Sequence, residues 1–282
     1  MDPHIERFAR QIILREIGGP GQKKLGAARV LIIGAGGLGC PAALYLAAAG
    51  IGFLRVVDAD LVSLSNLQRQ ILFRTSDIGR PKVAVMAEAL CALNPELAFE
   101  GRAEWFDAQS GPDLLSDCDL VLDGCDDYAT RLLVNAAAFG AGKPLISGAL
   151  GAWEGQLGLF HPAIPAKRNE IGAQDGASTP QASPADRRTA CYQCFLSEIP
   201  PDQETCATQG IIGALPGIIG SMMALEAIKW ILGMPTLPPG SLRLVDGRSG
   251  AQREVRVLAE PDCPICGSPK PGLAQCNDPV RS

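Results

Sequence analysis

The first 150 residues alternate short apolar runs with longer segments in which apolar residues recur every three or four positions. Short runs of this kind are typical of buried strands, and the periodic segments are typical of helices. The pattern predicts strands at residues 29–33, 53–57, 97–102, 119–122 and 144–148, and helices at residues 5–17, 40–49, 82–93 and 130–141. This alternation predicts a Rossmann-like α/β fold with a parallel, doubly wound sheet.

The pattern changes after residue 150, where strand-like segments at residues 155–160, 241–245 and 253–258 surround a long apolar helix at residues 211–232. A membrane span is the alternative interpretation of that helix. Pro216, Glu226 and Lys229 argue against it, and the uninterrupted apolar stretch is shorter than the about 20 residues that a span needs. We therefore predict a buried or dimer-interface helix and no membrane attachment.

Composition suggests where the parts of the chain begin and end. Residues 163–189 are polar and rich in Ala, Pro and Ser, which predicts a mobile loop, and residues 271–282 resemble a flexible tail. Between them, residues 1–162 form the predicted Rossmann-like part and residues 190–270 a C-terminal part. The net charge of −5 does not favour a broad nucleic-acid or membrane surface. The polar residues 1–10 lack the apolar run of a secretory signal, so we expect a cytoplasmic protein with reduced cysteines.

A glycine-rich loop follows the first predicted strand, with Gly36 and Gly37 at its centre. Glycines at this position allow a tight turn and let backbone N–H groups approach a phosphate. Asp58 ends the second strand, 22 residues after Gly36, near the spacing used to bind a ribose hydroxyl. The motif predicts a nucleotide site of some kind, and close packing of the glycines is the alternative.

Cationic and polar side chains come next: Ser65, Asn66, Leu67, Gln68 and Arg69, with Lys82 further along the chain. Nucleotidyl transfer builds negative charge on the phosphates, so an enzyme of that class needs several cations beside its nucleotide. Arg69 and Lys82 would supply them. A solvated surface loop is the alternative interpretation of this segment.

Two carboxylates, Asp126 and Asp127, follow the strand at residues 119–122. The carboxyl ends of strands face the ligand crevice in open α/β sheets, and carboxylates there commonly hold Mg²⁺. The alternative is that one of them caps the following helix. We expect Asp126 on the metal and Asp127 nearer the cap.

The cysteines form two pairs with metal-ligand spacing. They are Cys191 with Cys194, and Cys263 with Cys266. Four thiolates without an open position make a structural zinc site, which here would staple the C-terminal segment to the core. Cys206 is a candidate nucleophile for an acyl adenylate, and a passive thiol is its alternative. The only histidines, His4 and His161, are too far apart for a catalytic triad.

Taken together, these motifs resemble the MoeB/ThiF/HesA family of ubiquitin-activating-like enzymes, most closely its MoeB branch. The markers run from about residue 7 to residue 267. They are the segment Arg7 to Arg15, the glycine loop, Asp58 and Asp60, the segment Ser65 to Gln70, Lys82, Asp126 with Asp127, and the two cysteine pairs.

The resemblance implies an eight-stranded mixed sheet, a symmetric homodimer and bound ATP with Mg²⁺. It places Gly37 at the phosphates, Asp58 on the ribose, Asn66, Arg69 and Lys82 on the triphosphate, and Asp126 on magnesium. It also implies that Arg10 reaches across the dimer into the neighbouring ATP site.

The implied reaction is adenylylation of the C-terminal carboxylate of a ubiquitin-like sulfur carrier ending in Gly-Gly. The small subunit of molybdopterin synthase or the thiamin-pathway carrier would be the substrate, and pyrophosphate the second product. A separate sulfur donor would then form the thiocarboxylate. Cys206 matches the family's loop cysteine, which takes part in sulfur transfer in thiamin-pathway members. Residues 163–189 are longer and more polar than the family pattern, which leaves the pathway open.

Two other classes of function compete with this one. An NAD-dependent oxidoreductase would share the glycine loop and Asp58, but it leaves Arg69, Lys82 and the cysteine pairs unexplained. A silent scaffold that binds a ubiquitin-like partner would have no need of the intact set that is present here, which is Arg10, Asn66, Arg69, Lys82 and Asp126.

Overall fold

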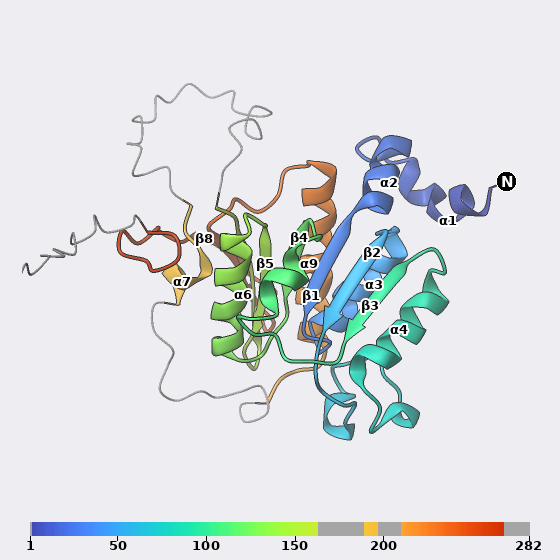
Figure 1. The fold of residues 1–282 in the computed structure, drawn as a ribbon, viewed down its shortest axis with the longest axis horizontal. Coiled ribbons are helices and arrows are strands. Elements are labelled where there is room, and N and C mark those ends of the chain that lie inside the picture. Colours follow the sequence, from blue (N-terminus) through green and yellow to red (C-terminus); the bar gives the residue numbers. More distant parts are fainter. Residues whose placement is uncertain (1, 163–188, 197–209, 268–282) are drawn as a thin grey trace, which may run out of the picture.

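One mixed sheet of eight strands runs through the described part of the chain, with the order β3-β2-β1-β4-β5-β6-β7-β8 (Figure 1). The structure, a computed structural model, describes residues 2–162, 189–196 and 210–267. The loop predicted at residues 163–189 (except Thr189), the tail predicted at residues 271–282, and Cys206 lie outside the described residues.

The sheet has a parallel half and an antiparallel half. The parallel strands are β1 (Arg29–Ile33), β2 (Phe53–Val57), β3 (Ala98–Arg102), β4 (Leu120–Asp123) and β5 (Leu145–Leu150). Each following strand is antiparallel to its neighbour: β6 (Glu154–Phe160), β7 (Ser241–Asp246) and β8 (Gln252–Arg256). This confirms the mixed, doubly wound sheet.

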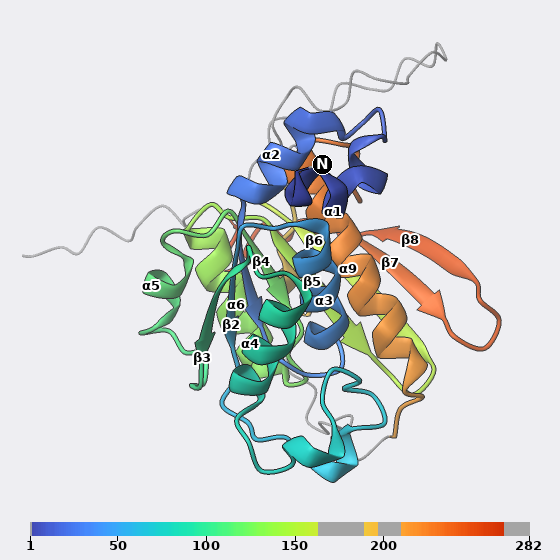
Figure 2. The same cartoon turned by 90° about the vertical axis from the view of Figure 1, so that its right-hand side faces the viewer.

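Helices cover both faces of the sheet because the central strands are apolar on both sides. In β1, Val30 and Ile32 join one core, while Leu31 and Ile33 join the other. The first core is covered by α3 (Gly39–Ala49), α4 (Lys82–Leu93) and α9 (Ala214–Leu232), and the second by α5 (Gly111–Leu115), α6 (Tyr128–Gly140) and α7 (Tyr192–Phe195) (Figure 2).

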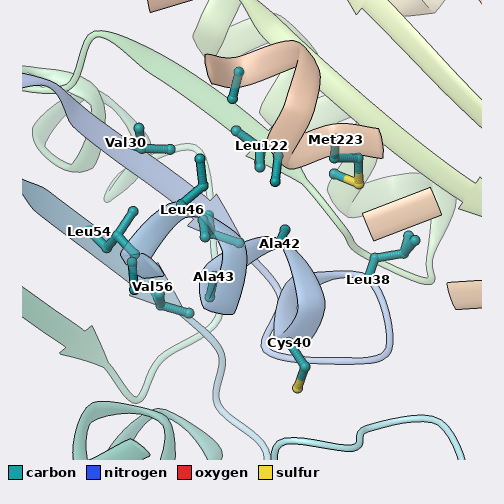
Figure 3. Close-up of a cluster of buried hydrophobic side chains, with 14 of the residues drawn as sticks. Val30, Leu38, Cys40, Ala42, Ala43, Leu46, Leu54, Val56, Leu122 and Met223 are labelled. Atoms are coloured by element: carbon teal, nitrogen blue, oxygen red, sulfur yellow. The ribbon is translucent and has the colours of Figure 1, made fainter. Parts of the chain in front are cut away.

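The helices α3 and α9 pack so closely that there is no room for a side chain at one point of contact. A Cβ atom added to Gly220 of α9 would lie 2.4 Å from the carbonyl oxygen of Leu38, which precedes α3. Beside this contact, Met223 of α9 joins Leu46 and Ala42 of α3 in the main core (Figure 3). The position of α9 is therefore tied to the glycine loop before α3.

Helix α9 is long and apolar enough to cross a membrane by length and composition, and 44% of its most apolar window is buried. It packs against α3, β5 and β6, as core helices of soluble proteins do. Ile219 and Met223 are fully buried, whereas Ile218 and Leu225 are exposed. One face thus belongs to the core, and the other remains apolar and uncovered among the described residues.

The N-terminal helix differs from the prediction for residues 5–17. α1 (Pro3–Ile12) ends five residues earlier, and a second helix, α2 (Gly18–Ala27), follows. Sequence reasoning missed α2 because glycine and proline fill its first turn and are poor helix formers. Tertiary packing overrides that preference, since Leu25 is fully buried and Gly21 lies against Leu232 of α9.

Candidate active site

A cleft opens at the carboxyl ends of β1 and β4, where the strand order reverses direction. The chain proceeds from β1 outward to β2 and β3, and then returns to place β4 on the other side of β1. Ligands of open α/β sheets bind at such switch points. The empty space of the cleft, its open mouth included, is about 1100 Å³.

The glycine loop forms one wall of the cleft. Gly34 has a φ of +94°, and a Cβ atom there would lie 3.0 Å from the carbonyl oxygen of Gly124. Gly36 and Gly37 line the cleft, and among the described residues their backbone N–H groups have no acceptor. The loop is therefore packed tightly, as the alternative interpretation of the glycines expects. Among the described residues its two free donors also suit an anion.

Asp58, Asp60 and Lys82 form an ion cluster beside the loop. The Lys82 amine, only 3% exposed, lies 2.6 Å from Asp60 Oδ2 and 3.8 Å from Asp58 Oδ2. Asp58 also accepts the backbone N–H groups of Ala35 at 2.7 Å and Asp60 at 2.8 Å. Burial raises the pKa of Asp58, and Lys82 and the two N–H donors oppose that shift.

Arg69 reaches the cleft from the loop after β2, and its neighbours support it. Its guanidinium donates to Asn66 Oδ1 at 2.9 Å and to the carbonyl oxygen of Ser65 at 3.2 Å. Leu67 packs against the main core, and Gln68 lies against Gly213, just before α9. These four predicted residues do not line the cleft itself. Ser65 and Asn66 hold Arg69 at the edge of the cleft.

The two carboxylates after β4 have separate roles. Asp127 is the N-cap of α6 and accepts the Thr130 N–H at 2.7 Å, as predicted for the cap. Asp126 is exposed in the cleft, and no hydrogen bond or ion pair to its carboxylate is found within the described ranges. Its free oxygens are the kind of ligand that Mg²⁺ prefers.

Three further residues of the cleft were missed. Gln70 is 4% exposed, and its Oε1 atom has no partner among the described residues, which marks it as a group that awaits a donor. The sequence signal that could have identified Gln70 as a site residue was its position next to Arg69. Trp105 lies 70% exposed at the rim, and Arg131 lies buried below Asp126. Nothing in their spacing pointed to a site.

Acidic side chains outnumber cationic ones around the cleft. The carboxylates are Asp58, Asp60, Glu104, Asp126 and Asp127, and the cations are Arg69, Lys82 and Arg131. Lys82 is already paired with the first two carboxylates. A polyphosphate would therefore be repelled by the remaining acids unless a cation accompanied it, and a divalent ion at Asp126 would supply that charge.

Arg10 lies far from the cleft of its own chain. It is exposed on α1, beside the end of the sheet where β1 begins, whereas the cleft lies where β1 ends (Figure 1). Arg10 and the cleft therefore lie at opposite ends of the strands. Arg10 thus has no route to this cleft within one chain.

The two cysteine pairs come together behind α6. All four sulfur atoms lie within 4.8 Å of one another, with 3.6 Å between Cys191 and Cys263 and 3.2 Å between Cys194 and Cys266. Ligands 2.3 Å from a tetrahedral zinc would be about 3.8 Å apart, so the cluster could hold zinc. The sulfurs of Cys40 and Cys125 are buried elsewhere, and burial raises the pKa of Cys40 to about 12, as expected of passive thiols.

The sequence pattern of the ThiF family matches residues 8–265. The chain belongs to the ThiF family. Among its relatives, a "Sulfur carrier protein adenylyltransferase" of Thermus thermophilus is 39% identical over 93% of this chain and 91% of that protein. The "Sulfur carrier protein ThiS adenylyltransferase" of Escherichia coli is 40% identical over 94% and 96%, and its "Molybdopterin-synthase adenylyltransferase" is 38% identical over 94% and 98%.

Solved structures share the fold of this ThiF-family chain. A crystal structure of Escherichia coli MccB with MccA-N7isoASN has a TM-score of 0.74 over 94% of this chain and 75% of that chain, at 21% identity. At that identity the likeness concerns architecture alone. The curated relatives named above are all adenylyltransferases, which supports that class of enzyme over an NAD-dependent oxidoreductase.

Proposed function

We propose that the protein is an adenylyltransferase that uses ATP to activate the C-terminal carboxylate of a ubiquitin-like sulfur carrier. The observation that carries the proposal is the meeting of Arg69 and Lys82 in one cleft with N–H groups of the glycine loop that have no acceptor in the described part of the chain. Its location at the switch point is where a nucleotide is expected. The names of the curated relatives supply the class of reaction and the carrier.

The chemistry needs positioning and charge more than a general base. A carrier carboxylate oxygen attacks the α-phosphorus of ATP, a new P–O bond forms, and the bond to the leaving pyrophosphate breaks. Arg69, Lys82 and the N–H groups of Gly36 and Gly37 stabilise the charge that builds on the phosphate oxygens. The carboxylate is ionised at neutral pH, which fits a cleft without histidine among its lining residues.

Metal ions complete the proposed enzyme. Asp126 would hold Mg²⁺, which neutralises phosphate charge when it is bound. The four cysteines would hold Zn²⁺ as a structural staple, because all four ligand positions are thiols and none is open. The thiols would need the reducing cytoplasm that we propose as the location of the protein.

The proposed carrier ends in Gly-Gly and resembles the small subunit of molybdopterin synthase, with the thiamin-pathway carrier as the alternative. The Escherichia coli relatives named for these two pathways are nearly equally similar, at 38% and 40% identity. In either case a separate sulfur donor would act on the acyl adenylate. The experiment measures the exchange of labelled pyrophosphate into ATP. This exchange should require a carrier that ends in Gly-Gly, the terminus that the two candidate carriers share. Quenching of NADH fluorescence without such exchange would favour an oxidoreductase instead.

We infer a symmetric homodimer from the uncovered apolar face of α3 and α9. Tyr45 is 59% exposed, Ile218 48% and Leu225 55%. A groove lined by Tyr45 and Leu225 is also lined by Gln11 of α1, next to Arg10. Contiguous exposed apolar side chains of this kind mark a protein interface. In a symmetric dimer built on this face, α1 of one chain would bring Arg10 to the cleft of the other.

Cys206, which lies outside the described residues, is proposed to act after adenylation. Replacing Cys206 with alanine should leave carrier-dependent pyrophosphate exchange within about twofold of the natural protein, because a thiol has no part in the attack on the α-phosphorus. Exchange assays of the two proteins check this. Cys40→Ala serves as a control for the loss of a thiol, and a collapse of exchange in Cys206→Ala alone would contradict this division of roles.

Trp105 should report nucleotide binding. The backbone N–H of Asp58 donates to the carbonyl oxygen of Arg102, so the proposed ribose ligand lies next to the segment that leads from β3 to Trp105 at the rim. Stacking of the base on Trp105 is worth about 1–3 kcal/mol by analogy with base–aromatic contacts, so Trp105→Ala should weaken ATP binding by that amount. ATP should change the tryptophan fluorescence of the natural protein and of Trp153→Phe, but not of Trp105→Phe. A full response in Trp105→Phe would exclude the stacking.

A further inference from the structure

A buried arginine lies directly beneath the proposed magnesium ligand. Arg131 of α6 is 4% exposed, and its Nη1 atom donates to Asp123 Oδ2 at 3.1 Å and to Ser147 Oγ at 3.0 Å. Ser147 in turn donates to the same Asp123 oxygen at 2.8 Å. Burial opposes the charge of Arg131, but the Asp123 carboxylate keeps its pKa above the usual arginine value. The guanidinium is thus a buried cation that is held in place by three hydrogen bonds.

The second terminal nitrogen of the Arg131 guanidinium donates a hydrogen bond to the backbone beside Asp126. Its Nη2 atom donates to the carbonyl oxygen of Cys125, and that carbonyl belongs to the peptide bond that continues into Asp126. The N–H of Cys125 is held as well, by Asp123 Oδ1 at 3.0 Å. Both polar groups of this backbone segment are therefore tied to one buried ion pair.

Asp126 depends on these backbone bonds, because its carboxylate has no other support within the described ranges. Its carboxylate forms no hydrogen bond or ion pair with any described residue, and it is exposed in the cleft. The direction in which its side chain leaves the backbone is set by the orientation of the preceding peptide. A metal ligand that is displaced by a fraction of an ångström binds its ion less well, which is why groups behind the ligand matter.

We propose that Arg131 is a positioning residue that orients the Cys125–Asp126 peptide so that Asp126 can bind the nucleotide's divalent cation. The inference rests on the proposed function, since it assumes that Asp126 binds Mg²⁺. Arg131 does not bind the ion, because its own charge is positive and its guanidinium donates to Asp123, Ser147 and Cys125.

The segment that carries the first cysteine pair also contacts Arg131 and its helix, α6. Tyr192, next to Cys191, places its ring 6.0 Å from the Arg131 guanidinium, and its backbone N–H donates to Asn135 Oδ1 at 2.9 Å. Asn135 lies one turn after Arg131 in α6, and its NH₂ group is buried without a hydrogen-bond partner among the described residues. The bond from Tyr192 to Asn135, next to the cysteine cluster, therefore holds α7 against the part of α6 that carries Arg131.

A purely structural role for Arg131 makes a different prediction. Buried ion pairs can often be replaced by apolar or neutral residues without loss of stability, so the fold alone does not require one here. A structural role predicts that any cost of substitution appears in the unfolding temperature. A positioning role predicts that the cost appears in the dependence on magnesium.

The test uses the double variant Asp123→Asn with Arg131→Met, which avoids leaving Asp123 charged and unpaired in the core. The half-saturating Mg²⁺ concentration for pyrophosphate exchange should rise by about 10- to 100-fold. Calorimetry should show weakened binding of ATP with Mg²⁺ and unchanged binding of ATP without it. Arg131→Lys keeps the positive charge but loses the planar guanidinium with its two donor arms. It should also raise the half-saturating Mg²⁺ concentration, so it provides the test if the double variant does not fold.

Arg55→Met is the matched control, because Arg55 is the other buried arginine paired with acids, Glu100 and Asp117, and it does not line the cleft. It should lower the unfolding temperature without changing the Mg²⁺ dependence. Tyr192→Leu should raise the half-saturating Mg²⁺ less than the Arg131 variants do. An unchanged value would overturn the part of the proposal that concerns the cysteine cluster.

Asp126→Ala separates this inference from the proposed function. If Asp126→Ala loses Mg²⁺-dependent ATP binding while folded Arg131 variants keep the natural Mg²⁺ dependence, the positioning role is overturned and the proposed function stands. If Asp126→Ala itself keeps the natural dependence, the magnesium assignment fails, and the positioning role fails with it.

Discussion

Replacing Asp126 with alanine should lower carrier-dependent pyrophosphate exchange by about a thousandfold while the fold stays intact. A metal ion stabilises transition-state charge by several kcal/mol, and each 1.4 kcal/mol corresponds to about a factor of ten in rate. The carboxylate is exposed and forms no hydrogen bond or ion pair with another described residue, so its loss should not reduce the unfolding temperature. Exchange assays and thermal unfolding of the same preparations check both statements.

Asp127→Asn is the control for this experiment. Asparagine caps a helix about as well as aspartate, so the bond to the Thr130 N–H can be retained and the protein should stay folded. Only a modest loss of exchange is expected, because Asp127 is engaged in the cap. If both variants lost activity equally, or if Asp126→Ala remained active, Asp126 would not be the magnesium ligand.

Replacing Arg10 with alanine should also reduce exchange by about a thousandfold, although Arg10 is remote from the cleft of its own chain. Arginines supplied in trans to a transferring phosphoryl group are worth about 10³–10⁵ in rate. Arg10 is an exposed residue near the end of α1, so its loss should not destabilise the subunit. Activity, unfolding temperature and dimer mass, measured together, show whether only catalysis is affected.

Mixing tests whether Arg10 acts across the dimer. In a hybrid of Arg10→Ala and Asp126→Ala chains, the first chain keeps Asp126 and receives Arg10 from the second. One site in each hybrid is then complete, and random pairing makes half of all dimers hybrids, so about a quarter of the natural activity should return. Arg15→Ala replaces another nearby arginine and serves as the control. Mixtures that remain inactive would show that Arg10 does not act in trans.

The sequence predicted the frame of the site well because its signals are local. The strands that became β1 and β2 and the helix that became α4 have the predicted bounds. Alternation of apolar runs and helices implies a parallel sheet, and a parallel sheet brings the residues after its strands to one edge. Arg69, Lys82 and Asp126 were therefore expected in one crevice, and all three line the cleft.

The remaining features depend on contacts between distant parts of the chain. No local pattern could show that Lys82 would lie 2.6 Å from Asp60, or that Gln70 would be buried with an unpaired oxygen. Arg131 has the spacing of an ordinary polar position of α6 and becomes buried only because β4, β5 and α7 surround it. The same reason explains α2, whose packing against α9 outweighs its unfavourable composition.

The backbone contact between Gly220 and Leu38 constrains how the nucleotide preference of this protein can change. The loop before α3 is pressed from behind by α9, and a Cβ atom on Gly37 would lie 3.0 Å from Pro216 of the same helix. A side chain added at Gly37 would therefore press on a 19-residue helix as well as on the proposed phosphate site. Evolution or engineering toward a different nucleotide has more freedom at the open rim, where a residue such as Trp105 can be exchanged without moving a helix.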